Sequence, residues 1–237
     1  MQQSRSATFA ALAVIAVLAI TARGDGAAHR AEWPTHGIDA HELVWDAMNE
    51  HGLIVANGGV PTQPETGRVK RHLERMDSSL VRLDARDGTL SGQWRLEDPR
   101  LSLRHMAWNA EARALGIALQ AEHDDEQAKA RAPVLARFDG HSLGPVSAPV
   151  PLAGYGGDIA ALGNTFAVSC PRAQGVALYG AGGAWDRFLP LAEACALASA
   201  SAVLWAGGHP AALTWAHDTW ATRSAPDVRL DNHWIAL

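Results

Sequence analysis

The segment that decides the fold lies in the first half of the chain. It reads Ser79-Leu-Val-Arg-Leu-Asp-Ala-Arg-Asp-Gly88 and resumes after a short gap as Gln93-Trp-Arg-Leu96. Apolar and polar residues alternate on both sides of an Asp-Gly pair, and Asp-Gly is a residue pair that closes tight β-hairpins. The segment therefore predicts two antiparallel strands joined by a turn at Gly88.

The same hairpin pattern recurs along the chain. Copies begin at Val134, with a second strand expected over residues 146–152, at Gly175, with a second strand over 185–191, and more weakly at Leu213. Equivalent turn positions in the copies are 55, 41 and 37 residues apart, at Asp84, Asp139, Gly180 and His217. A period of about 40–50 residues is typical of four-stranded propeller blades. The sequence therefore predicts an all-β fold, a β-propeller.

Two more short apolar stretches precede each hairpin, which gives four strands per unit and about four blades over residues 34–237. These stretches are residues 41–46 with 53–57, 104–109 with 114–120, 158–162 with 165–170, and 195–202 with 203–207. Residues 228–237 predict a strand that completes the last blade. The charged segment from Glu122 to Arg131 has no apolar stripe and predicts a solvated loop between strands rather than a core helix.

Residues 1–33 support two alternatives. Arg5 followed by the apolar run from Thr8 to Ala22 has the order of a secretory signal peptide, and the run is shorter than the roughly 20 residues of a membrane span. No integral membrane span is expected after processing. Alternatively, residues 14–33 form the outer half of an earlier blade, because Arg23-Gly-Asp-Gly26 echoes the turn before Gly88. The propeller would then be truncated, and its open blade faces would favour self-association.

Composition limits the function classes. The chain has 237 residues, a formal charge of −5 and no long block of one sign, so no nucleic-acid partner is expected. Cys170 and Cys195 fit no metal-binding spacing and are expected to be free buried thiols, with a single disulfide as the alternative.

Several segments carry a resemblance to a known family. They are residues 34–43, 53–59, 64–70, 76–80, 103–106 and 231–233. In these segments the chain resembles a bacterial family called domain of unknown function 1513, over residues 30–237. The resemblance implies a seven-bladed propeller exported to the periplasm, usually with a twin-arginine signal, and iron-uptake proteins of the imelysin type as partners. It implies no activity. The chain lacks the twin arginine and the N-terminal blades, which favours the truncated alternative.

Four polar residues fall at equivalent starts of the inner strands. They are Glu42, His105, Asp158 and Cys195, with His41 beside the first. Mixed carboxylate and imidazole groups bind first-row divalent metals. The sequence thus suggests a divalent-metal site formed by His41, Glu42, His105 and Asp158. In the alternative interpretation these groups bond backbone atoms or water around the axis.

The connection from Asn57 to Ser78 is too long for a hairpin turn. Asn57, Arg68 and Lys70 in it are candidate ligand-binding residues, since long loops often carry function. Alternatively, Gly58 and Gly59 supply turn geometry and the basic residues form a solvated face.

These observations favour a periplasmic ligand- or protein-binding or scaffold module, and leave enzymatic activity open. One alternative is a metal-dependent hydrolase of the lactonase propeller type, because residues 41–45 and 104–108 look like the inner strands of those proteins. The other is a truncated remnant without independent function. The fold alone does not distinguish among these three functional hypotheses.

Overall fold

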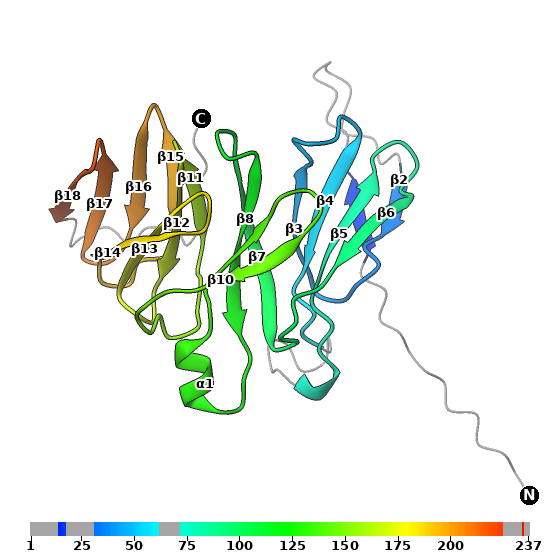
Figure 1. Ribbon diagram of the computed structural model, residues 1–237, viewed down its shortest axis with the longest axis horizontal. Coiled ribbons are helices and arrows are strands. Elements are labelled where there is room, and N and C mark those ends of the chain that lie inside the picture. The colour runs from blue at the N-terminus through cyan, green and yellow to red at the C-terminus, as the bar shows by residue number, and fades with distance from the viewer. Residues whose placement is uncertain (1–13, 18–30, 62–71, 225–233, 235–237) are drawn as a thin grey trace, which may run out of the picture.

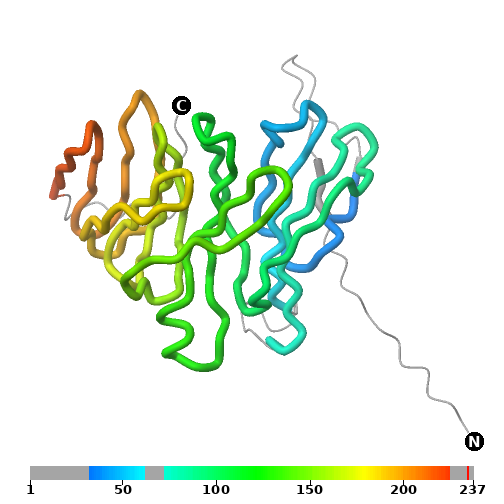
Figure 2. Tube along the Cα trace, in the orientation of Figure 1, coloured from blue at the N-terminus to red at the C-terminus, as the bar shows by residue number. Residues whose placement is uncertain are grey.

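The computed structural model describes residues 14–17, 31–61, 72–224 and 234 (Figure 1). It contains four four-stranded antiparallel sheets, each built from strands that are consecutive in the chain, and a separate two-stranded sheet. This confirms the prediction of an all-β propeller with four blades. Figure 2 shows the chain passing from one end of the row of sheets to the other.

Each blade uses its strands in chain order, from one edge of the sheet to the other. The first two blades consist of β3 (Ala40–Trp45), β4 (Gly52–Asn57), β5 (Ser79–Asp84) and β6 (Leu90–Trp94), then β7 (Leu101–Asn109), β8 (Ala114–Ala121), β9 (Leu135–Phe138) and β10 (Leu143–Val146). The other two consist of β11 (Ile159–Leu162), β12 (Thr165–Cys170), β13 (Gly175–Gly180) and β14 (Trp185–Pro190), then β15 (Leu197–Ala200), β16 (Val203–Gly207), β17 (Ala211–Ala216) and β18 (Thr219–Ser224).

The first strands of neighbouring blades lie against one another. β3 contacts β7, β7 contacts β11, and β11 contacts β15. The four first strands therefore lie next to one another, and the other strands of each sheet extend away from them (Figure 1). We call the surface formed by these four first strands the axial surface. Residues near the starts of different blades are thereby brought together although they are far apart in sequence.

Apolar clusters fill each junction between blades. Ile54 and Leu80 of the first blade pack with Ile117 of the second, and Leu178 of the third packs in one cluster with Leu204 of the fourth. Both faces of an internal blade are buried, which explains the near-continuous apolar runs in the second strands. Each fully buried side chain of this size contributes about 1.5–3 kcal/mol.

The predicted turn at Gly88 is confirmed. β5 pairs with β6 in an antiparallel hairpin, and Gly88 has a φ of 75°, a left-handed conformation that glycine adopts without strain.

A two-stranded sheet covers part of the outer face of the first blade. β1 (Val14–Val17) pairs with β2 (Ala31–Pro34), and Trp33 packs against Leu53 and Leu83. Both alternatives for residues 1–33, the signal peptide and the outer half of an earlier blade, stay predictions. Within the described residues, no helix is long and apolar enough to cross a membrane.

The segment from Glu122 to Arg131 is not a core helix, as expected, but its second part is a short exposed helix rather than a loop. α1 (Glu126–Arg131) is capped by Asp125, whose carboxylate accepts hydrogen bonds from the backbone N–H groups of Gln127 and Ala128. The helix buries none of its residues, so it depends on its cap rather than on an apolar stripe. A second short helix, η2 (Leu73–Arg75), lies in the connection between β4 and β5.

Two strand positions also differ from expectation. β10 runs over Leu143–Val146 instead of 146–152, because the Asp139 carboxylate accepts hydrogen bonds from the N–H groups of His141 and Ser142 and turns the chain early. The fourth strand of the last blade is β18, joined to β17 through His217 and Asp218, both of positive φ. Of the strand expected at 228–237, only Trp234 lies within the described residues.

Candidate ligand-binding site on the axial surface

Polar side chains gather where the first and second blades meet on the axial surface. Asp39 precedes β3, His41 and Glu42 lie on β3, and Arg104 and His105 lie on β7. Both strands have a register irregularity at these positions, between Ala40 and Glu42 and between Leu103 and Met106. Such irregularities re-aim side chains relative to a regular strand. They explain how these groups face one another across the junction.

The two imidazoles are in direct contact. Nε2 of His41 lies 3.1 Å from Nε2 of His105, with the ring centroids 4.6 Å apart and the planes at 70°. His41 is exposed, whereas the His105 side chain is 18% exposed. Each histidine comes from a different blade, so the contact depends on the packing of the two sheets.

The neighbours of the pair define its tautomers. Arg104 Nη1 lies 3.2 Å from Nδ1 of His41, and a guanidinium can only donate, so this nitrogen accepts. The His41 proton is then on Nε2 and is donated to Nε2 of His105. His105 in turn carries its proton on Nδ1, which lies 3.9 Å from Glu42 Oε2.

Arg104 is the most buried side chain of this polar cluster. Its side chain is 9% exposed, and Nη1 lies 3.1 Å from Oδ2 of Asp39. Its Nε is buried and has no hydrogen-bond acceptor among the residues that the structure describes. A Cβ on Gly58 would lie 3.1 Å from the guanidinium carbon and 2.5 Å from Asp39 Oδ2. Only glycine at position 58 therefore allows this close approach.

Glu42 links the first two blades. Its carboxylate accepts a hydrogen bond from the backbone N–H of Met106 on β7. Burial raises the pKa of Glu42 to about 7, the hydrogen bond from Met106 partly opposes the rise, and the charge of Asp158 adds to it. Glu42 is therefore a carboxyl that exists in both protonation states near neutral pH.

Asp158 has the same linking role between the last two blades. Its Oδ1 accepts from the N–H of Ile159 and its Oδ2 from the N–H of Leu197 on β15, each at 2.9 Å. Cys195, half-buried nearby, is a free thiol whose pKa is raised by burial and further by Asp158.

The structure thus brings three of the four predicted metal ligands, His41, Glu42 and His105, to one junction and places Asp158 at another. Both carboxylates already accept backbone hydrogen bonds. Among the described residues there is no group of three or more His, Cys, Asp or Glu side chains that could hold a metal ion. The metal site stays a prediction, with the two imidazoles as its best-placed donors.

The predicted ligand-binding residues of the long connection are arranged differently. Asn57 is fully buried, and its Nδ2 donates to Thr35 O at 3.0 Å and Ser79 Oγ at 3.3 Å. Arg68 and Lys70 lie outside the described residues. A Cβ on Gly59 would clash with the backbone N of Ser78, in agreement with the alternative in which the glycines supply turn geometry.

Sequence reasoning did not single out Asp39 or Arg104. The available signal was a charged residue inside an apolar strand, since Arg104 stands between Leu103 and His105 in β7. Charged side chains are rarely buried unless they are paired, so such a residue points to a partner from another element.

A family model described as "Protein of unknown function (DUF1513)" matches residues 11–237. The chain belongs to this family. The resemblance drawn from the sequence is thereby confirmed. No curated protein matches the DUF1513 chain.

Solved structures similar to the DUF1513 chain include two lyases. A streptogramin B lyase structure matches with a TM-score of 0.59 at 12% identity, covering 85% of this chain and 59% of the lyase. Virginiamycin B lyase from Staphylococcus aureus matches with a TM-score of 0.58 at 13% identity, covering 85% of this chain and 60% of the lyase. The DUF1513 chain therefore spans less than two thirds of these proteins, and at such identities the likeness shows the fold alone.

Proposed function

We propose that this DUF1513 chain is a binding module that holds a small acidic molecule, bearing a carboxylate or phosphate, at the His41–His105 pair. The observation that carries the proposal is the contact between two imidazoles from adjacent blades, one of them exposed, with the buried guanidinium of Arg104 behind them.

The hydrogen-bond inventory suits an acceptor-rich ligand. In the tautomers assigned above, His41 Nε2–H is directed at the His105 ring, and an oxygen of the ligand can replace that ring as acceptor. Arg104 supplies a fixed positive charge, although Asp39 offsets part of it. Hydrogen bonds between charged donors or acceptors are roughly twice as strong as neutral ones. A carboxylate or phosphate is therefore preferred over a neutral ligand.

Binding is favoured over catalysis by the way the cluster is bonded. The Glu42 carboxylate is engaged by Met106, and His41 Nδ1 by Arg104. A general base needs a free acceptor directed at the substrate proton. The pair is better suited to hold a ligand than to activate one.

Isothermal titration calorimetry with succinate, citrate and inorganic phosphate tests the proposal. We expect His41→Ala to weaken binding of the best probe by about tenfold or more, in line with loss of a charge-assisted bond. His141→Ala removes an exposed imidazole at the turn before β10 and is the matched control. No binding of any of the three acids by the folded protein would refute the proposal, as would equal affinities of the two variants.

One observation favours a second candidate, a metal-dependent hydrolase of lactonase type. The Nε2 atoms lie 3.1 Å apart, close to the about 3.3 Å between two imidazole nitrogens on one tetrahedral zinc ion. Against it, a neutral His41 that binds metal through Nε2 carries its proton on Nδ1, and would lose the bond from Arg104. Stoichiometric zinc that is lost in His105→Ala, together with lactone hydrolysis, would favour this candidate.

The location and partners of the protein are also part of the proposal. The family resemblance supports a periplasmic protein that works beside iron-uptake proteins of the imelysin type. Cell fractionation and the mass of the mature chain test the location. Recovery of the intact chain from the cytoplasm would contradict it.

A further inference from the structure

The outer edges of the blades differ in how well they are protected. β6, β10, β14 and β18 are the last strands of their sheets, so each has one side without a paired strand among the described residues. Such a side presents unpaired backbone N–H and C=O groups, and proteins usually shield it with proline, charged side chains, bulges or short strands.

Three of these edges carry such features. β6 pairs with β5 through a register irregularity and has Gly92 at its centre. β10 has four residues, one of them Pro145. β14 has a register irregularity as well, together with Asp186 and Pro190. Pairing of a further strand is disfavoured at all three edges.

β18 lacks this protection. Its six residues pair with β17 without an irregularity, and all six are exposed. The sequence Thr-Trp-Ala-Thr-Arg-Ser has no proline or glycine and one charged residue, Arg223, and threonine and tryptophan are good strand formers. In Figure 1 this strand lies at the far end of the row of blades. Of the four outer edges, β18 is therefore the one suited to accept another strand.

We propose that β18 pairs antiparallel with β18 of a second copy of this chain about a two-fold axis, so that the two fourth blades form one continuous sheet. A two-fold axis makes a patch complementary to itself, and each copy presents the same unprotected edge. This inference goes beyond the acid-binding function proposed above and uses none of the residues of that site, so either proposal can fail without the other.

The turn before β18 determines which backbone groups are free. His217 and Asp218 join β17 to β18, both with positive φ, and the residues that flank a two-residue turn of this kind exchange both hydrogen bonds. Bonded and non-bonded pairs alternate from there along the ladder. The N–H and C=O groups of Trp220, Thr222 and Ser224 therefore point away from β17.

These free groups favour one register. In a two-fold antiparallel pair one residue lies opposite its own copy, and with Thr222 in that position Trp220 lies opposite Ser224 of the second copy. All the free groups named above are then bonded. Pairs of threonines across strands are favourable, and Arg223 falls opposite Ala221, so like charges are not directly opposed.

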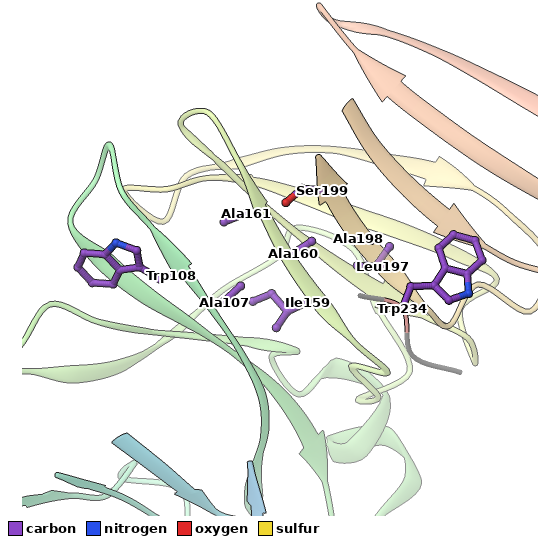
Figure 3. A pocket seen from close by; sticks show the side chains of 9 residues that line it. All are labelled: Ala107, Trp108, Ile159, Ala160, Ala161, Leu197, Ala198, Ser199 and Trp234. Carbon is purple, nitrogen blue, oxygen red and sulfur yellow. The ribbon is translucent and has the colours of Figure 1, made fainter. Parts of the chain in front are cut away.

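The open face of the fourth blade is a poorer interface than its edge. Ala206 packs toward the third blade, so Gly207, the next residue of β16, faces the other way. A Cβ on Gly207 would lie 2.6 Å from the indole of Trp234, which Figure 3 shows beside Leu197 of β15. Part of this face is thus already covered by the chain itself.

The proposed interface is small. β18 has no buried residue, and interfaces below about 1,200 Å² are weak or transient. We expect a dissociation constant on the order of 0.1 mM. Analytical ultracentrifugation from about 10 µM to about 1 mM, the range around that constant, should show a monomer that becomes a dimer.

A proline tests the backbone bonds. Thr222→Pro removes an N–H that the ladder with β17 does not use, so it should abolish the dimer and retain the thermal transition. Thr222→Val keeps the N–H and the branched side chain and is the matched control, with a dissociation constant within about twofold of the wild type.

Charge exchange tests the register, and it keeps the proposal testable if the proline variant does not fold. Thr222→Lys and Thr222→Glu each place like charges directly opposite one another, so each alone should dimerise at least about threefold more weakly, and their mixture should recover the wild-type affinity. Thr219→Lys, on the same strand but outside the paired residues, and His41→Ala, in the polar cluster, should leave the affinity unchanged.

Hydrogen exchange distinguishes the edge from the open face. Raising the protein concentration should slow amide exchange at Trp220, Thr222 and Ser224. Slowing over residues 203–207 instead would show that the copies meet through the face and would overturn the proposal. A wild type that stays monomeric over the whole range, a dimer that survives Thr222→Pro, or a mixture of the Lys and Glu variants without recovery would each overturn it as well.

Discussion

The carboxylate of Asp158, at the start of β11, accepts a hydrogen bond of 2.9 Å from the backbone N–H of Leu197, at the start of β15. One side chain of the third blade thereby satisfies a buried backbone donor of the fourth. Glu42 and Met106 repeat this relationship between the first and second blades. Carboxylates at the starts of first strands thus hold neighbouring blades together.

Replacing Asp158 by Ala is expected to destabilise the protein by about 2–3 kcal/mol, because the N–H groups of Ile159 and Leu197 both lose a charged acceptor in a buried place. Urea denaturation measures the change. Asp186→Ala, at an exposed ion pair with Arg187, should change stability by less than about 0.5 kcal/mol. A loss of similar size in both variants would contradict the linking role.

Glu42 predicts a specific pH dependence of stability. Its pKa is raised from 4.5 to about 7 in the folded protein, so between these values the native state holds a proton that the unfolded chain releases. Stability should therefore fall as pH rises from about 4.5 to 7 and change little from this group above that. The full shift would correspond to about 3 kcal/mol. Because the side chain is 31% exposed, we expect about 1–2 kcal/mol.

Melting temperatures of wild type and Glu42→Gln across this pH range measure the effect. The glutamine amide oxygen can still accept from Met106 but does not titrate, so the variant should show a flatter profile. A constant difference between the two proteins at every pH would argue against the assignment to Glu42.

Gly58→Ala is expected to disturb the polar cluster. The added Cβ would meet the Arg104 guanidinium and Asp39 Oδ2, and overpacking of this kind costs about 1–3 kcal/mol. Binding of the acidic probe should weaken as well. Gly144→Ala, with nothing within 4 Å of the new Cβ, is the matched control for stability and binding. Equal behaviour of the two variants would show that Arg104 and Asp39 adjust freely.

The two cysteines should differ in reactivity. Cys170 is fully buried, and burial raises its pKa to about 12, whereas Cys195 is only half-buried. Thiolates, not thiols, react with iodoacetamide. Mass spectrometry of the folded protein should therefore show slow labelling of Cys195 and none of Cys170, with both labelled in urea. Labelling of the two at equal rates without denaturant would contradict the burial of Cys170.

The sequence by itself determined the blades. Alternation of apolar residues and the turn at Gly88 are local properties, and the hairpin of β5 and β6 follows from them. The capped helix α1 was missed because apolar periodicity does not reveal a helix that buries nothing. The early start of β10 was missed because the Asp139 carboxylate accepts hydrogen bonds from the N–H groups of His141 and Ser142, which shorten the turn.

Only the tertiary structure decided which polar groups meet. Equivalent strand positions suggested that His41, Glu42, His105 and Asp158 converge, and the structure brings the first three to one junction. These positions did not reveal that Arg104 and Asp39 are bonded in the same cluster. Nor did they show that Asp158 belongs to another junction. The register irregularities in β3 and β7 turn these side chains, and their partners come from a neighbouring sheet. Contacts of this kind depend on how whole blades pack, which no local sequence pattern encodes.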